Sequence, residues 1–474
     1  MRCEEVFFGT YRKPPVNVAF CPYRVCPMGA HSDHQYGKVT GFAIDKGVHI
    51  AYAPKQNGVI ELASLNFEKR AQWYVNGVPD NQGDWADYLR GATKSLGSRY
   101  PLSRGIAGVI EGSLPIGGLS SSAAVIISFL AALCAVNHLR LSQSELIDVA
   151  QHAETDYVGV SVGKLDQSCE VLSRRNHLLY LDTKDDSYEL IPTVPSMKPY
   201  EIAVFFSGVQ RSLVGSKFNM RVDELKSAAY ALKGYAIDDG REDELLVPYG
   251  RFSETRLRDV PRSVYDDYKN RLPSAWRRRA EHFYTEFARV EAGAEAWRRG
   301  DIETFGRLST ESGWSSIYNY ETGSDELKAL YEAIIRADGV YGGRFSGAGF
   351  KGCCMALIDP AYEERMREQV SEAYQYIEKA GAFCSSWRAW GRKSVLSALL
   401  DWDGKTVDAP LFRDDHLGQN AVELGECTVS LLTHAKGILT KAYEQAESAF
   451  AREAVFCSGV PVNPTDTRFH QQEN

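Results

Sequence analysis

Residues 111–125, EGSLPIGGLSSSAAV, decide the fold. Apolar runs flank this stretch at residues 106–110 and 125–133, so the local order is a strand, a glycine-rich loop and a helix. A helix that begins at such a loop has unpaired backbone N–H groups, and its dipole makes the same place positive. Gly117 and Gly118 let the backbone approach an anion closely. Taken alone, the stretch fits a phosphate loop and a serine N-cap on a buried helix equally well.

Composition describes a globular chain and excludes several classes of partner. The chain has 474 residues, of which 44% are hydrophobic and 24% charged, enough for two or three domains. The net charge is −8 and no long basic block occurs, so we expect no nucleic-acid partner. The N-terminal residues MRCEEVFFGT contain no apolar core of signal-peptide length, and no apolar run approaches the length of a membrane span, so we expect a cytoplasmic protein without a membrane partner.

The distribution of the cysteines also favours a cytoplasmic protein. Ten are scattered along the chain without a CxxC pair, and Cys353 and Cys354 are adjacent within an apolar run. This distribution predicts reduced core thiols in a cytosolic enzyme, not a disulfide scaffold or a zinc site.

Apolar spacing predicts strands and helices in both halves of the chain. In the first half we expect strands at 39–50, 58–65, 104–111 and 178–181, helices at 84–96, 122–139 and 142–156, and a loop at 159–167. Pro192, Pro195 and Pro199 indicate a domain boundary near residue 195. In the second half we expect strands at 201–206 and 353–358, an irregular surface insertion at 236–262, and helices at 216–232, 275–299, 301–312, 325–337, 362–379 and 419–456. The fold class is α+β.

Three separated segments resemble one known motif set. They are PYRVCPMGAHSD at residues 22–33, PIGGLSSS at 115–122 and GRFSGAGFKGCC at 343–354. Together they resemble the three motifs of the GHMP small-molecule kinases, and within these the galactokinase branch. The resemblance covers roughly residues 5–380 and continues through WADY at 85–88, AQHAE at 150–154 and GKLDQ at 163–167.

This resemblance implies an architecture of two domains with a cleft between them. The first, residues 1–195, would be a mixed α/β kinase domain with a left-handed crossover, and the second, residues 196–380, a ferredoxin-like α+β domain. The resemblance does not extend to residues 381–474, which we expect to be an unassigned, partly helical extension. Nothing in the sequence indicates the oligomeric state.

The resemblance also assigns the ATP side of the cleft. The loop that would hold the triphosphate comprises Gly117, Gly118, Leu119, Ser120, Ser121 and Ser122. Ser122 and Glu154 would hold Mg²⁺, a hard cation that keeps water and phosphate ligands. Trp85 and Tyr88 would line the adenine pocket, although aromatic residues at this helical spacing are commonly core residues.

Catalysis is implied at Asp166 and Arg24. Asp166 would accept the proton of the attacking sugar hydroxyl, and Arg24 would lie against Asp166 and the transferring phosphoryl group. A structural ion pair is the ordinary explanation for Arg24 and Asp166, and a solvated helix position the ordinary one for Glu154. Their joint order and spacing favour the catalytic interpretation.

The sugar side is implied at Ala30, His31, Asp33, Gly163 and Phe218. Galactokinases carry glutamate at the position of Ala30, where the carboxylate bonds the C6 hydroxyl. Asp33 would still hold the C3 and C4 hydroxyls, so only the pocket around C6 is altered. A glutamate there would repel a C6 carboxylate, and alanine removes that repulsion and opens space. His31 would contact sugar hydroxyls or fix the turn of its motif, and His34 is expected to be structural.

The sequence therefore predicts an ATP- and Mg²⁺-dependent sugar 1-kinase of the galacturonokinase type, acting on a small-molecule sugar. Alternatives are a galactokinase, or a non-catalytic sugar sensor on the same fold. Two departures from the family pattern are Phe218, where relatives usually carry tyrosine, and a glycine loop shorter by one residue. Candidate cations for a substrate carboxylate are Lys164, Arg211 and Arg221.

Overall fold

Two β-sheets organise the chain. The computed structural model describes residues 2–208, 218–349 and 352–374, together with the backbone of residues 383–385 and 457–458. The predicted helix at 419–456 lies outside these residues. Within the described ranges, no helix is both long and apolar enough to cross a membrane.

Seven described strands form the first sheet, in the order β4-β3-β5-β2-β6-β7 with β1 paired to β2. Only β3 and β5 run parallel, and the helix α2 lies between them in the chain. The strands are β1 (Asn17–Val25), β2 (Lys38–Lys55), β3 (Val59–Ser64), β4 (Ala71–Tyr74), β5 (Gly105–Gly112), β6 (His177–Asp182) and β7 (Tyr188–Pro192). The predicted strands of this half are confirmed.

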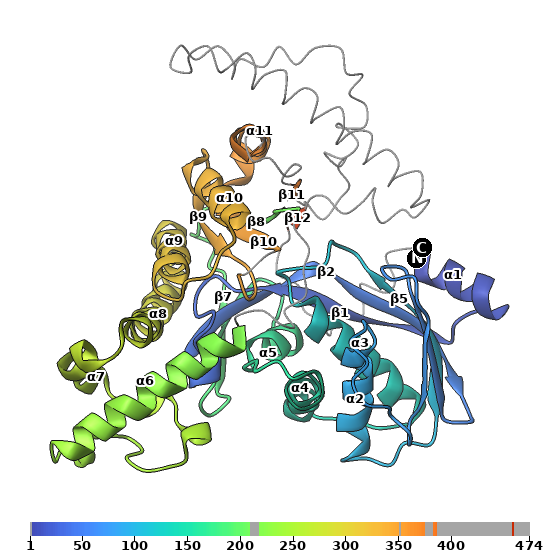
Figure 1. The fold of residues 1–474 in the computed structure, drawn as a ribbon. Helices are drawn as coiled ribbons and strands as arrows, with labels where there is room; N and C mark the ends of the chain where they lie inside the picture. Colours follow the sequence, from blue (N-terminus) through green and yellow to red (C-terminus); the bar gives the residue numbers. More distant parts are fainter. Residues whose placement is uncertain (1, 209–217, 350–351, 375–382, 386–456, 459–474) are drawn as a thin grey trace, which may run out of the picture.

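Both faces of this sheet are covered by helices (Figure 1). Ile50 and Ile110 face the main core, whereas Ala51 and Val109 face a smaller cluster with Phe7 of α1, because successive strand residues point to opposite faces. The helices are α1 (Arg2–Tyr11), α2 (Asp87–Gly97), α3 (Ser121–Val136), α4 (Gln143–His152), the π-helix η2 (Ala153–Val158) and α5 (Leu165–Leu172).

The prediction of a loop through residue 167 was wrong, because α5 begins at Leu165. This helix has eight residues and no side-chain cap at Lys164, so the usual start signal is missing. By contrast, Ser142 and Glu145 form a complete capping box at α4.

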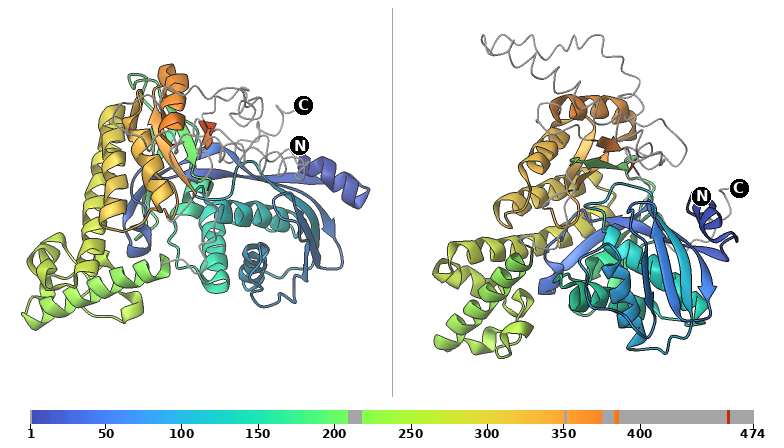
Figure 2. Two further views of the ribbon diagram at one scale, coloured as in Figure 1. Left: turned by 45° about the horizontal axis from the view of Figure 1, so that its top comes forward. Right: turned by 45° about the vertical axis from the view of Figure 1, so that its right-hand side comes forward.

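Five described strands form the second sheet, all antiparallel. Their order is β11-β8-β10-β9, and β12 also pairs with β8. The strands are β8 (Glu201–Phe206), β9 (Val340–Phe345), β10 (Cys353–Ile358), β11 (Phe383–Ser385) and β12 (Cys457–Ser458). The helices of this half are α6 (Phe218–Asp238), α7 (Arg262–Tyr268), α8 (Ser274–Arg298), α9 (Ile302–Tyr318), α10 (Asp325–Arg336) and α11 (Glu363–Tyr374). Both views of Figure 2 separate these elements (green to orange) from those of the first half (blue to teal).

The largest core runs across both halves. It joins Phe42 and Ile50 of β2 to Trp297 of α8, Phe305 of α9 and Leu357 of β10. The predicted boundary at residue 195 falls between β7 and β8, and it stays a prediction.

The segment 236–262 differs from the expected surface insertion. Leu245, Leu257 and Val260 are buried and join a second core with α6, α7 and α8. The backbone N–H of Leu257 donates to Oε1 of Gln35 (3.1 Å), so the segment folds back onto the chain beside the first motif. The sequence of this segment is mostly charged, so the few apolar residues that pack into the core do not stand out in it.

Candidate active site

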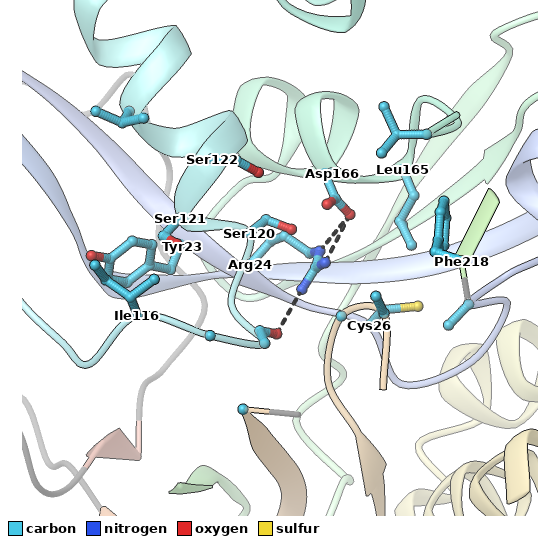
Figure 3. A pocket seen from close by; sticks show the side chains of 18 of the residues that line it. Tyr23, Arg24, Cys26, Ile116, Ser120, Ser121, Ser122, Leu165, Asp166 and Phe218 are labelled. Atoms are coloured by element: carbon cyan, nitrogen blue, oxygen red, sulfur yellow. Dashed lines mark hydrogen bonds and ion pairs between the residues drawn. The ribbon is translucent and has the colours of Figure 1, made fainter. Parts of the chain in front are cut away.

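Residues of all three motifs line one cavity of about 780 Å³. It is lined by parts of both halves of the chain, and Figure 3 shows Arg24, Ser122, Asp166 and Phe218 around it. Fourteen of the predicted site residues line it: Arg24, Ala30, His31, Asp33, Trp85, Tyr88, Gly117, Gly118, Ser120, Ser121, Ser122, Gly163, Asp166 and Phe218. The other two, Leu119 and Glu154, are buried directly behind the wall.

Arg24 ties three segments together at the centre of the cavity. Its Nε and Nη2 donate to Oδ1 of Asp166 at 2.9 and 2.8 Å (Figure 3). Its Nη1 donates to the carbonyl of Gly118 (3.2 Å) and the hydroxyl of Ser346 (3.4 Å). Burial by itself would lower the pKa of this guanidinium, but the charge and hydrogen bonds of Asp166, together with Cys26 and Glu170, outweigh it and the pKa rises. Arg24 is therefore a fixed positive charge between the glycine loop and the third motif.

The glycine loop has the backbone of an anion site. Gly117 and Gly118 have φ of 133° and 83°, in the left-handed region that favours glycine. A Cβ on Gly118 would lie 2.9 Å from the backbone nitrogen of Cys353, so the loop packs tightly on the third motif. Ser120 precedes α3 without capping it, and its Oγ is buried with no partner in the described structure. The serine N-cap alternative is therefore not what the fold uses.

Leu119, a member of the predicted triphosphate loop, does not line the cavity. Its side chain is 1% exposed and lies in the main core. Its carbonyl accepts from the backbone N–H of Arg24 (3.3 Å). Leu119 therefore anchors the glycine loop to β1, and its side chain does not face the cavity.

Ser122 and Glu154 form a pair of oxygen donors. Glu154 sits in the π-helix η2, 3% exposed, and hydrogen-bonds to the Ser122 hydroxyl and to Nε2 of Gln167 (2.5 Å). Burial raises the pKa of Glu154 to about 7, so a cation that binds this carboxyl group near neutral pH would displace its proton. In the described ranges no group of three or more His, Cys, Asp or Glu could hold a metal. One carboxylate and one hydroxyl fit Mg²⁺, which takes its remaining ligands from water and phosphates.

Asp33, Gly163 and His31, which the sequence assigns to the sugar, line the cavity together. A Cβ on Gly163 would lie 2.2 Å from Oδ2 of Asp33, so only glycine leaves this carboxylate in place. Burial, and then the charge of Asp166, raises the pKa of Asp33 to about 6. His31 stacks on Tyr320 (centroids 4.2 Å apart), and burial lowers its pKa well below the usual value. Its buried Nε2 has no partner among the described residues.

Helix α8 holds the backbone of the first motif, and sequence reasoning missed this role. Nε2 of His282 donates to the Ala30 carbonyl (3.1 Å), and Oε1 of Glu286 accepts from the Gly29 N–H (2.7 Å). Burial would raise the pKa of Glu286, but Arg289, His282 and Arg344 together lower it to about 2. The sequence predicts a helix at residues 275–299, but it does not indicate what that helix contacts.

The opposite end of the cavity is aromatic. Trp85 lies just before α2 and stacks on Phe67, with ring centroids 5.8 Å apart and planes 5° apart. Its Nε1 donates to the carbonyl of Lys69 (2.9 Å). Tyr88 lines the same end of the cavity. Phe67 was not predicted, because nothing in its local sequence connects it to Trp85.

The three candidate cations have different places. Lys164 does not line the cavity, and its ammonium is paired with Asp148 (3.0 Å) and Asp186 (2.6 Å). Arg211 lies outside the described residues. Arg221 lines the cavity, one helical turn from Phe218.

Comparison with known families finds two matches. The family of GHMP kinases N terminal domains matches residues 87–174, and the family of GHMP kinases C terminal domains matches residues 294–375.

Individual relatives agree with these matches. A galacturonokinase of Arabidopsis thaliana is 38% identical over 384 residues, covering 77% of this chain and 88% of that protein. A galactokinase of Roseiflexus sp. (strain RS-1) is 30% identical over 371 residues, covering 78% and 90%. The crystal structure of Lactococcus lactis galactokinase complexed with galactose superimposes with a TM-score of 0.72 at 26% identity, covering 80% of this chain and 95% of that one.

Proposed function

The chain belongs to the GHMP kinases, and from that membership we propose that it transfers the γ-phosphoryl group of ATP to the anomeric hydroxyl of D-galacturonic acid, giving α-D-galacturonate 1-phosphate. The observation that carries the choice of sugar is Ala30, which lines the cavity at the position where galactokinases carry glutamate. The similarity to a galacturonokinase at 38% identity supports it.

Asp166 and Arg24 would carry the transfer. Asp166 accepts the proton of the C1 hydroxyl as the sugar oxygen attacks the γ-phosphorus, and the bond to the β-phosphate oxygen breaks with its electron pair leaving on ADP. Arg24 orients the carboxylate and places its charge beside the phosphoryl group. Their fixed geometry supports these roles, since phosphoryl transfer depends mainly on positioning and electrostatics.

The glycine loop and its serines would bind the triphosphate. Backbone N–H groups at the start of α3 face the cavity end of the loop, where the helix dipole favours negative charge. Ser122 and Glu154 would hold Mg²⁺, which neutralises phosphate charge when bound. Trp85 and Tyr88, with Phe67 beside them, would bind the adenine through apolar contact.

Recognition of the sugar would rest on Asp33, His31 and Gly163. Asp33 accepts the C3 and C4 hydroxyls, and Gly163 leaves room for its carboxylate. His31 lines the same cavity, and its neutral imidazole has a buried Nε2 without a partner among the described residues. Phe218 closes the wall without the hydroxyl that related enzymes place there.

A galactokinase is the second candidate, supported by the relatives and the solved structure that bear that name. The decisive experiment measures ATP consumption with galacturonate, galactose and glucuronate side by side. We expect kcat/KM to be highest for galacturonate. A clear preference for galactose would overturn the uronate assignment, and no turnover of any sugar would favour a non-catalytic sensor.

We also propose a cytoplasmic location. The cysteines whose side chains the structure describes are free and buried: Cys3, Cys21, Cys26, Cys134, Cys169, Cys353 and Cys354. Free thiols are stable in a reducing compartment. Imaging of the tagged full chain in its own cells tests this, and signal confined to a secretory compartment would contradict it.

A further inference from the structure

Arg221 carries a guanidinium nitrogen that the fold leaves without a partner. Its Nη1 donates to both carboxylate oxygens of Glu224 (3.1 and 2.9 Å), and its Nη2 donates to Oε2 of Glu321 (3.4 Å). Its Nε is buried and has no hydrogen-bond partner in the described part of the chain. The residue is only 7% exposed. A buried donor of a charged group is costly when it lacks an acceptor, so a ligand acceptor is expected there.

Arg221 and Ala30 line the same cavity, and a series of contacts between side chains connects them. Phe218, one turn away on α6, places its ring 6.4 Å from that of His31. His31 in turn stacks on Tyr320, which directly precedes Glu321, the partner of Arg221. His282, which binds the Ala30 carbonyl, also packs 5.2 Å from Tyr320. Ala30, His31 and Arg221 therefore surround one end of the cavity.

The charges around Arg221 leave a positive excess. Arg279 binds both glutamates that pair with Arg221, Glu224 and Glu321, and Arg278 binds Glu321. Three arginines thus face two carboxylates. Of the described residues that line the cavity, the cations are Arg24 and Arg221, and Arg24 is bound to Asp166 at the phosphoryl end. Among the lining residues that the structure describes, Arg221 is therefore the cation that remains for an anionic group on the sugar.

We propose that Nε of Arg221 donates a hydrogen bond to the C6 carboxylate of the substrate, an inference that rests on the proposed uronate kinase function. Ala30 provides the space for the carboxylate, and Arg221 provides the charge. The pairing of Nη1 and Nη2 with glutamates holds the guanidinium plane and leaves Nε as the nitrogen without a hydrogen bond to a described residue. A sugar with a neutral C6 group would leave this donor unpaired, which gives the site its preference for an acid.

The test compares three substrates in two variants and a control. Arg221→Met removes the donor and its charge, and Arg221→Lys keeps a charge in the same network without Nε. Arg278→Met removes a charge from that network at a residue that does not line the cavity. Each protein is assayed with galacturonate, galacturonamide and galactose, with melting temperature and the KM for ATP as checks on folding and on the ATP side.

We expect Arg221→Met to lower the galacturonate-to-galactose ratio of kcat/KM by about 10- to 100-fold, the range for a hydrogen bond to a charged group. The ratio of galacturonate to galacturonamide should fall in parallel, and Arg221→Lys should lie between the wild type and Arg221→Met. An unchanged ratio in Arg221→Lys, or an equal loss in Arg278→Met, would overturn the inference. If the wild-type protein prefers galactose, the proposed function itself is overturned. The wild-type protein is therefore assayed with all three substrates before the variants.

Discussion

Asp166 binds Arg24 through one carboxylate oxygen only. Oδ1 accepts both the Nε and the Nη2 bonds, at 2.9 and 2.8 Å. Oδ2 makes no hydrogen bond to any described residue, and the carboxylate lines the cavity. The ion pair therefore fixes the orientation of the side chain while one oxygen stays available to a sugar hydroxyl.

Replacing Asp166 with asparagine should remove catalysis and keep sugar binding. The amide keeps the size of the side chain but cannot accept the proton, so we expect kcat to fall by about 10²- to 10⁴-fold. Calorimetry with galacturonate should still detect binding. The matched control is Glu170→Gln, one turn further along α5, at a buried carboxyl group that does not line the cavity. Burial raises the pKa of Glu170 well above its usual value, so the amide mimics the protonated acid and kcat should be near that of wild type. Full turnover in Asp166→Asn would show that another group is the base.

Replacing Ala30 with glutamate should disfavour the uronate. A carboxylate at this buried position faces the cavity or stays desolvated, and in either case it repels a substrate carboxylate. Ala30→Gln has the same size without the charge, so the difference between the two variants isolates electrostatics. We expect kcat/KM for galacturonate to be at least about tenfold lower in the glutamate variant than in the glutamine variant. Equal values would mean that space, and not charge, selects the sugar.

Asp33 should make the folded protein less stable at neutral pH. Burial raises its pKa from 3.8 to about 6, so between these values the folded chain holds the proton more tightly than the unfolded chain. Its contribution to the free energy of unfolding therefore falls as the pH rises through this window, and stays low above it. Since the carboxylate is partly open to the cavity, Asp33→Asn should gain about 1–2 kcal/mol at about pH 7.5.

Urea unfolding of wild type and Asp33→Asn at about pH 7.5 and about pH 4.5 measures this difference. The gain should fall to about a third of its size at the lower pH, while kinase activity is lost at both. A difference that does not depend on pH would indicate a packing effect of the amide and contradict the shifted carboxyl group.

Gly163→Ala should damage the sugar side selectively. The new methyl group would stand where Oδ2 of Asp33 now lies, and also 2.8 Å from the backbone nitrogen of His34. We expect the KM for the sugar to rise by about tenfold or more, with a much smaller change in the KM for ATP. Gly234→Ala in α6 is the control, because its Cβ would meet nothing within 4 Å and alanine favours a helix. An equal rise of both KM values in Gly163→Ala would point to a general distortion.

The sequence predicted the parts of the site that are local and missed those that depend on distant contacts. The glycine loop, the capping box of Ser142 and most strands follow from spacing and turn chemistry within a few residues. The packing of His282 and Glu286 on the first motif joins segments more than two hundred residues apart, and no local pattern encodes it. The strand β9 was also missed, because Gly342, which packs on Gly306 of α9, and Gly343, which packs on Ala356 of β10, conceal the strand pattern. The motifs predicted which residues line the cavity, but only the structure shows which of their polar atoms have no hydrogen-bond partner among the described residues.

The core that runs from Phe42 to Leu357, together with the Arg24 bridge from Asp166 to Ser346, limits how this protein can be rearranged. In a hybrid that joins one half of this chain to the other half of a relative, both the packing of that core and the hydrogen bonds of Arg24 would have to form between unmatched halves. New sugar preferences are therefore more accessible through a few substitutions inside one cavity than by exchange of whole halves. A lineage of such enzymes would diversify at positions such as 30 and 218 while its two halves are inherited together.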